Sequence, residues 1–163
     1  MQSLHELSPT PAPFKGHTGA NLERYLEGTS FAERYPLSIL IAEDNYINRR
    51  VFIMFLKHLG YHADCVENGL ECLNLANHGN YDLILSDVDM PAMSGIECAR
   101  ELRRAGILSR IIAVIGSKVE SPHEQCLNAG MDGFIPKPFR PEELKHALRE
   151  THRLKIEKSQ ARQ

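Results

Sequence analysis

Three acidic residues in this sequence stand at the ends of apolar runs, where their side chains could act together on a ligand. Glu43 and Asp44 follow the run 38–42, and Asp87 follows the run 83–86. A run that is apolar at nearly every position is typical of a strand covered on both faces, as in a parallel sheet. Carboxylates at the carboxyl ends of such strands lie in the crevice where open α/β sheets bind ligands.

Carboxylates gathered in one crevice repel one another. Two like charges about 4 Å apart cost roughly 4 kcal/mol at an effective dielectric constant near 20. A cation must therefore hold the cluster together, and this requirement points to the function of the chain.

The elements that position these residues come from an alternation of strand-like and amphipathic segments. The predicted strands cover residues 38–42, 61–67, 83–86, 110–115 and 133–136. The predicted helices cover 45–59, 69–77, a segment opened by a capping box at 94–97, a segment opened by a capping box at 121–124, and a last segment from about 141 to 154. Units of this kind with short loops predict an α/β fold, a doubly wound parallel sheet with helices on both faces.

Two of these helices have apolar residues at helical spacing that predict how they pack. The first helix has such a set in Ile47, Val51, Met54, Phe55 and Leu59. The last helix has one in Leu144, Ala147, Leu148, Thr151 and Leu154.

The length of 163 residues fits one domain with modest tails. Residues 1–35 are predicted to be an N-terminal extension or linker with at most a short helix, residues 36–152 the domain, and 153–163 a tail that extends the last helix. The net charge of −2 gives no general attraction to nucleic acid. No apolar stretch approaches the roughly 20 residues that span a bilayer. We expect a cytoplasmic protein with reduced cysteines and neither nucleic acid nor membrane as a partner.

Three segments, at 39–45, 82–95 and 130–139, resemble in order and spacing the motifs of the response-regulator receiver domain of two-component signalling. The resemblance covers about residues 37–149, and the segment 45–49 is most similar to receivers attached to hybrid sensor histidine kinases. It implies the flavodoxin-like strand order 2-1-3-4-5. It also implies a phospho-accepting module of a phosphorelay, not a turnover enzyme, with a sensor histidine kinase or a histidine phosphotransfer protein as the donor.

By this resemblance Asp87 is the phosphoacceptor, whose carboxylate attacks a phosphoryl donor and becomes an aspartyl phosphate. Mg²⁺ would be held by Asp44, by Asp87 and by the backbone carbonyl of Asp89. Glu43 would act on the metal through water. Mg²⁺ prefers oxygen ligands and keeps several waters, which suits this set. Lys137 would contact the phosphoryl group, and the peptide bond that follows it is expected to be cis.

One position departs from the family pattern, because Ile115 stands where the serine or threonine at the end of the fourth strand is expected. Isoleucine has no hydrogen-bond donor and is stiff at its first side-chain torsion. It cannot bond a phosphoryl group, and it would resist the shift of the aromatic switch residue, Phe134. Ser117 could substitute only if the loop bends unusually. We expect phosphorylation of Asp87 to be retained and its conformational readout to be weak or altered; a neutral enlargement of the core is the alternative.

Two other functions stay open for the domain. The first is a receiver-like scaffold or dimerisation module that works without phosphorylation, through the face from the fourth strand to the fifth helix. The second is a phosphatase of the haloacid-dehalogenase type, suggested by the D-x-D at 87–89. It is disfavoured because Pro91 stands where threonine or valine is usual and because no cap module is present.

Several other polar residues are predicted to be solvated and without a role in the site. They are Asp82 at a strand start, Asn48 and Arg49 on the polar face of the first helix, and a basic face made of Arg100, Arg103 and Arg104.

Overall fold

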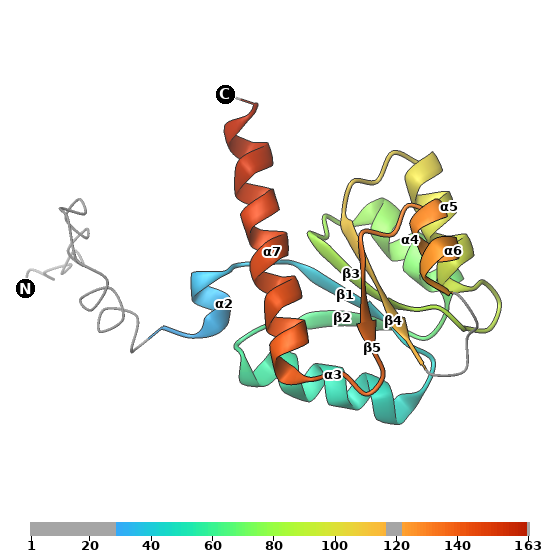
Figure 1. Ribbon diagram of the computed structural model, residues 1–163, viewed down its shortest axis with the longest axis horizontal. Helices are drawn as coiled ribbons and strands as arrows, with labels where there is room; N and C mark the ends of the chain where they lie inside the picture. The colour runs from blue at the N-terminus through green and yellow to red at the C-terminus, as the bar shows by residue number, and fades with distance from the viewer. Residues whose placement is uncertain (1–28, 117–121, 163) are drawn as a thin grey trace, which may run out of the picture.

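The computed structural model describes residues 29–116 and 122–162. At its centre is a sheet of five parallel strands in the order β2-β1-β3-β4-β5 (Figure 1). The strands are β1 (Ile39–Ala42), β2 (Ala63–Val66), β3 (Leu83–Asp87), β4 (Arg110–Ile115) and β5 (Gly133–Pro136). The predicted α/β fold class and strand order are therefore confirmed.

The helices are α2 (Phe31–Arg34), α3 (Tyr46–His58), α4 (Gly69–His78), α5 (Gly95–Arg104), α6 (Pro122–Asn128) and α7 (Pro141–Gln160). Helices α3 and α7 cover one face of the sheet, and α4, α5 and α6 cover the other (Figure 1). None of the helices in the described ranges has both the length and the apolar character needed to cross a membrane.

Alternate residues of each central strand point to opposite faces of the sheet, which gives the domain two cores. In β1, Leu40 belongs to the core beneath α4 and α5, whereas Ile39 and Ile41 belong to the core beneath α3 and α7. In β4, Ile111 and Ile112 divide between the two cores in the same way. A strand that must fill both cores is apolar at every position, which explains the continuous runs in the sequence.

The helix ends follow local signals in the sequence. The side chain of Asn45 caps α3 by accepting from the N–H of Asn48, and Ser94 and Glu97 form the predicted capping box of α5. After α3 the chain turns at Gly60, whose φ of +93° favours glycine. The capping box predicted at 121–124 begins outside the described residues.

The predicted apolar set on α3 is only partly correct as a description of packing. The residues of α3 that are fully buried against the sheet are Phe52 and Leu56. Three members of the predicted set are exposed instead, namely Ile47, Val51 and Met54. Apolar residues occur almost all round this helix, so their spacing could not tell which side would face the sheet.

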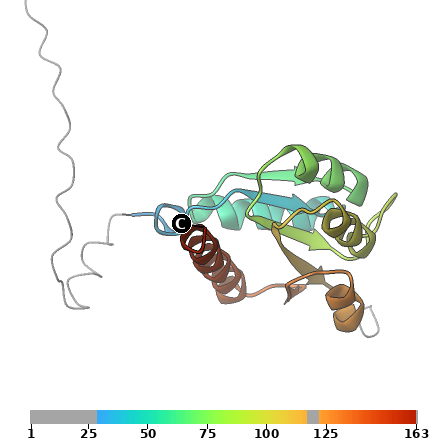
Figure 2. The same ribbon diagram turned by 90° about the horizontal axis from the view of Figure 1, so that it is seen from above.

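The segment before β1 packs at the amino end of the sheet, beside α7 (Figures 1 and 2). The ring of Phe31 lies 4.8 Å from that of Tyr35 and 6.4 Å from that of Tyr61. On the α7 side, the Arg149 guanidinium carbon lies 5.8 Å from the Phe31 ring and His152 lies edge-on to Tyr35. The described part of the predicted short helix, α2, is therefore fixed to the domain.

Candidate functional site

The carboxyl edge of the sheet brings together the side chains that the sequence singled out. Glu43 and Asp44 directly follow β1, Asp87 is the last residue of β3, and Lys137 directly follows β5. Glu43, Asp44 and Asp87 each offer one carboxylate oxygen, and these oxygens all lie within 4.8 Å of one another. Glu43 and Asp87 are buried, whereas Asp44 is exposed at the mouth of the site.

Lys137 provides the positive charge within this cluster. Its Nζ lies 2.7 Å from Oδ2 of Asp87 and 2.8 Å from Oε2 of Glu43. The Glu43 oxygen has no well-directed hydrogen bond among the described residues, so charge attraction alone supports it. One ammonium therefore faces two buried carboxylates, and the cluster keeps an excess of negative charge.

This arrangement fits a magnesium ion. All of the donor atoms are carboxylate oxygens, which hard divalent cations prefer, and a buried Glu43 oxygen still lacks a directed partner. Two of the three carboxylates are shielded from water, so a cation among them would be poorly screened and strongly attracted.

The pKa values of the site follow from burial and from these contacts. Burial, against the opposing hydrogen bond from Lys137 and with a contribution from the charge of Glu43, leaves the pKa of Asp87 raised to about 6. Burial lowers the pKa of Lys137, but its contacts with Asp87 and Glu43 outweigh this effect and leave the pKa above its ordinary value. Lys137 is therefore protonated at neutral pH and remains a cation in the site.

Backbone contacts fix the orientation of the carboxylates. The N–H of Asp89 donates to Oδ1 of Asp87 at 3.2 Å, and the N–H of Asn45 donates to Oε1 of Glu43 at 3.1 Å. The start of α5 comes so close to β3 that a Cβ on Gly95 would lie 1.9 Å from the backbone oxygen of Asp87. Glycine is required at this position because any side chain would push the backbone of Asp87 away.

Arg49 was wrongly predicted to be a surface residue. Its side chain is only 12% exposed, and its Nη1 donates to the backbone oxygens of Glu43 and Asp44 at 2.7 and 3.3 Å. Its Nη2 pairs with Glu67 at 2.7 Å. Arg49 thus holds the loop that carries two of the three carboxylates, a contact that the sequence signals only by placing a basic residue one turn into the helix that follows the acidic pair.

Ile115 is buried at the end of β4, beside the site and without a polar group to offer it. Its backbone oxygen accepts from the N–H of Lys137 at 2.8 Å. Phe134 is half-buried against the same core cluster as Ile115, and its ring meets that of His123 edge-on at 4.5 Å. The predicted substitute, Ser117, lies outside the described residues.

Two other polar residues differ from their prediction as solvated groups. Asp82 accepts at 2.9 Å from the N–H of Ser38 and pairs at 2.9 Å with Lys155, so it ties β1 and α7 to the start of β3. Arg103 donates to the backbone oxygens of three residues and pairs with Asp132 at 2.8 Å. The ion-pair partners of these two residues, Lys155 and Asp132, lie far away in the sequence, and local patterns give no signal of such contacts. The predicted cis peptide bond between Lys137 and Pro138 is present.

Comparison with known proteins identifies the class to which this fold and site belong. Residues 39–149 match the response regulator receiver domain family. The chain is 35% identical over 157 residues to histidine protein kinase 1 of Candida albicans, in an alignment that covers 89% of this chain and 6% of that protein.

Two solved structures share the fold. The first is the receiver domain of the sensor histidine kinase PA1611 of Pseudomonas aeruginosa, with magnesium coordinated in the active-site cleft. It is 34% identical with a TM-score of 0.66, and the match covers 71% of this chain and 97% of that one. The second is the receiver domain of the Saccharomyces cerevisiae response regulator Ssk1, solved in complex with the histidine phosphotransfer protein Ypd1. It is 26% identical with a TM-score of 0.66, and the match covers 73% of this chain and 90% of that one.

The chain belongs to the response regulator receiver domain family. Receivers are phosphoacceptor modules of two-component and phosphorelay signalling and not turnover enzymes, and this module contains the predicted set of acidic residues and lysine in one place.

Proposed function

We propose that Asp87 accepts a phosphoryl group from a phosphohistidine in a reaction that requires Mg²⁺. The observation that carries this proposal is the convergence of Glu43, Asp44, Asp87 and Lys137 from three strand ends onto one partly buried site. A carboxylate oxygen of Asp87 would attack phosphorus, the bond from phosphorus to the donor imidazole would break, and the imidazole would leave with the electron pair.

The residues around Asp87 have separate parts in this reaction. Asp44, Asp87 and the backbone carbonyl of Asp89 would hold Mg²⁺ directly, with Glu43 acting through water. The metal would neutralise charge on the phosphoryl oxygens. Lys137, which now pairs with Asp87 at 2.7 Å, would contact an oxygen of the transferred group and so remain next to the new acyl phosphate.

The donor protein would meet the exposed apolar side of α3. Tyr46, Ile47, Val51 and Met54 are 62%, 66%, 48% and 63% exposed, and α3 starts two residues after Asp44. Exposed apolar groups beside a reactive site are typical of a docking surface. A sensor histidine kinase or a histidine phosphotransfer protein would cover them, as the family of the chain and the complex formed by Ssk1 support.

The output would be atypical, because Ile115 cannot bond a phosphoryl oxygen. We propose that the face from β4 to α7 acts through protein contacts, including a homodimer, with neither nucleic acid nor membrane as a partner. All four cysteines are free, which supports a cytoplasmic setting. We further propose that residues 36–152 form the receiver, that residues 153–163 continue its last helix and that residues 1–35 precede it as an extension, with α2 fixed to the receiver.

Mass spectrometry tests the proposal directly. Incubation with acetyl phosphate and Mg²⁺ should add one phosphoryl group to the intact protein, and EDTA should prevent the addition. To test docking, Ile47→Glu should slow transfer from a phosphorylated phosphotransfer protein but leave labelling by acetyl phosphate unchanged. Leu127→Glu, at an exposed apolar residue of α6, is the matched control. If no adduct forms under conditions that label an ordinary receiver, phosphorylation of this chain is rejected. The alternative is then the phosphorylation-independent scaffold, which Ile115 favours.

A further inference from the structure

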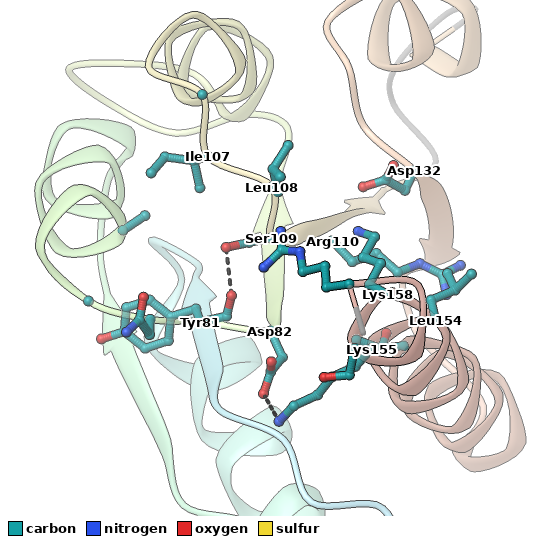
Figure 3. Close-up of a pocket in the computed structure, with 17 residues that line it drawn as sticks. Tyr81, Asp82, Ile107, Leu108, Ser109, Arg110, Asp132, Leu154, Lys155 and Lys158 are labelled. Carbon is teal, nitrogen blue, oxygen red and sulfur yellow. Dashed lines mark hydrogen bonds and ion pairs between the residues drawn. The ribbon is translucent and has the colours of Figure 1, made fainter.

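A cleft of about 540 Å³ lies at the amino ends of β3 and β4, at the opposite end of the sheet from Asp87 (Figure 3). One wall consists of the loops at 79–82 and 106–110. The other wall is the C-terminal part of α7 from Thr151 onward, together with Arg162 just beyond the helix end. The volume is within the range of about 300–1,000 Å³ that is usual for ligand sites. Its residues have no part in the phosphoryl transfer proposed above.

The α7 wall of the cleft is basic. Lys155 and Lys158 lie three residues apart on one side of the helix, Arg162 follows two residues after its end, and all three line the cleft. Lys155 is already paired with Asp82 at 2.9 Å. Lys158 and Arg162 form no ion pair with any residue in the described ranges. Two cations are therefore left without a counter-charge.

Arg110 adds a third unpaired cation to the lining. Its Nε and Nη1 are buried, and neither donates a hydrogen bond to a described residue. Glu150 accepts two hydrogen bonds from Arg153, which lower its pKa, and the charge of Arg110 also lowers it. Its carboxylate is therefore already paired with Arg153 and does not accept from Arg110. A buried guanidinium without an acceptor is costly, so an anion brought to this wall would be favoured.

The acidic residues of the cleft cannot neutralise these cations, because both have other partners. Asp82 accepts from the N–H of Ser38 and pairs with Lys155. Asp132 pairs with Arg103 and accepts from the N–H of Ile111, both at 2.8 Å. The cleft therefore carries net positive charge in a chain whose overall charge is −2.

The apolar part of the lining indicates which kind of anion fits. Leu108 is largely exposed at the cleft, and Ile107 and Leu154 are half-buried beside it (Figure 3). A free inorganic anion would not use these side chains. A nucleic acid would need a broader basic surface than this one, which two aspartates interrupt. An extended peptide that contains acidic side chains as well as a leucine would use the cations and the apolar groups together.

We propose that this cleft binds a carboxylate-rich, leucine-containing segment of a partner protein. Its acidic side chains would pair with Lys158 and Arg162, and its apolar side chain would lie against Leu108. Because the cleft and Asp87 are at opposite ends of the sheet, the segment could be bound while a phosphoryl donor occupies the other end.

Fluorescence anisotropy of the full chain with the labelled peptide Glu-Glu-Leu-Glu-Glu-Leu-Glu-Glu tests the proposal. The double variant Lys158→Glu/Arg162→Glu should raise the Kd at least about tenfold, since it reverses two charges that face the peptide. Binding should weaken with added salt. In ¹⁵N-labelled protein the peptide should shift the amide signals of residues 106–110 and 154–162. Lys158 is an exposed residue in the last turn of α7 and Arg162 an exposed residue just after it, so both substitutions leave the core intact.

The control variant is Lys57→Glu/Arg100→Glu, which makes the same change in net charge at two exposed residues that do not line the cleft. It should keep the wild-type Kd within about twofold, a span near the 0.4 kcal/mol expected of weak surface charge effects. The proposal is overturned if the peptide does not bind, if both variants weaken binding equally, or if the amide shifts fall elsewhere. It is also overturned if single-stranded DNA or inorganic triphosphate binds this cleft more tightly than the peptide does.

Discussion

The strand ends at the carboxyl edge of the sheet fall into two groups that differ in chemistry. The ends of β1, β3 and β5 supply Glu43, Asp44, Asp87 and Lys137. The three carboxylates form one cluster, and Lys137 contacts two of them within hydrogen-bonding range. The end of β4 supplies Ile115, which is buried and apolar. Under the proposed function, the groups that would accept a phosphoryl group and the position that would sense it come from different strands, so one can change while the other stays intact.

The energies involved are consistent with this separation. A neutral hydrogen bond contributes on the order of 1 kcal/mol, so the loss of one hydroxyl removes little from the site. The charges around Asp87 are buried and interact much more strongly. We therefore expect substitutions in the acidic group to have larger effects than any at Ile115.

The strongest test of the comparison removes the acceptor. Asp87→Asn should abolish labelling by acetyl phosphate, because an amide oxygen is a poor nucleophile and a weaker magnesium ligand. Intact-mass analysis measures the adduct. Asp82→Asn, at the opposite end of β3, is the matched control and should be labelled like the wild type. Labelling that survives in Asp87→Asn would place the acceptor elsewhere.

Removal of the cation tests the electrostatic part of the site. Lys137→Met leaves two buried carboxylates without their partner, so in EDTA the free energy of unfolding should fall by about 3 kcal/mol. Mg²⁺ should restore much of this loss, because it can take over the positive charge. Urea unfolding with EDTA and with Mg²⁺ measures both values. Lys145→Met removes only an exposed pair with Glu142 and should cost less than about 1 kcal/mol; an equal loss in both variants would contradict the expectation.

The pH dependence follows from the pKa of Asp87, which burial raises to about 6 from its ordinary 3.8. Below pH 6 the folded protein takes up a proton at Asp87, so Mg²⁺ affinity should fall by up to about tenfold per pH unit. Without metal, the folded state binds more protons than the unfolded state between pH 6 and 3.8, so this group should stabilise the fold as the pH falls through that range. Calorimetric titration and urea unfolding measure the two effects. Asp87→Asn should remove the part of each slope that comes from this group, and slopes identical to wild type would exclude Asp87 as their source.

The smallest expected effect concerns the readout. Phosphorylation of the wild type should shift few amide signals around β4 and β5, since Ile115 cannot draw the loop inward. Ile115→Thr restores a hydroxyl and removes bulk, so phosphorylation should then shift more signals, including those near Phe134. Comparison of ¹⁵N spectra with and without acetyl phosphate measures this difference. Equally large shifts in both proteins would show that the readout does not depend on residue 115.

The acidic cluster could be predicted from the sequence because its residues directly follow strands whose apolar character is continuous. The proposed roles of these residues as metal ligands, and the order of the strands, came from the family resemblance and not from the pattern of residues. The buried residues of the central strands could be predicted for the same reason. Those of α7 could be predicted because Leu144 and Leu148 lie on a clearly apolar side of the helix.

The contacts that failed to be predicted are those made to backbone oxygens, those with partners distant in the sequence, and those of a helix that is apolar on several sides. Arg49 and Arg103 donate to backbone oxygens, and a backbone oxygen has no signature in the sequence. The exposed side of α3 was assigned to the interior because Ile47 and Met54 are no less apolar than Phe52. Only the position of the helix on the sheet decides which of them is covered.

Helix α2 fixes the path by which the chain enters the receiver. Phe31 and Tyr35 hold this segment against α7 at Arg149 and His152. The chain therefore enters the receiver beside α7, at the amino edge of the sheet (Figures 1 and 2). Asp87 lies at the carboxyl edge, so whatever is attached through this segment would not obstruct the approach of a phosphoryl donor.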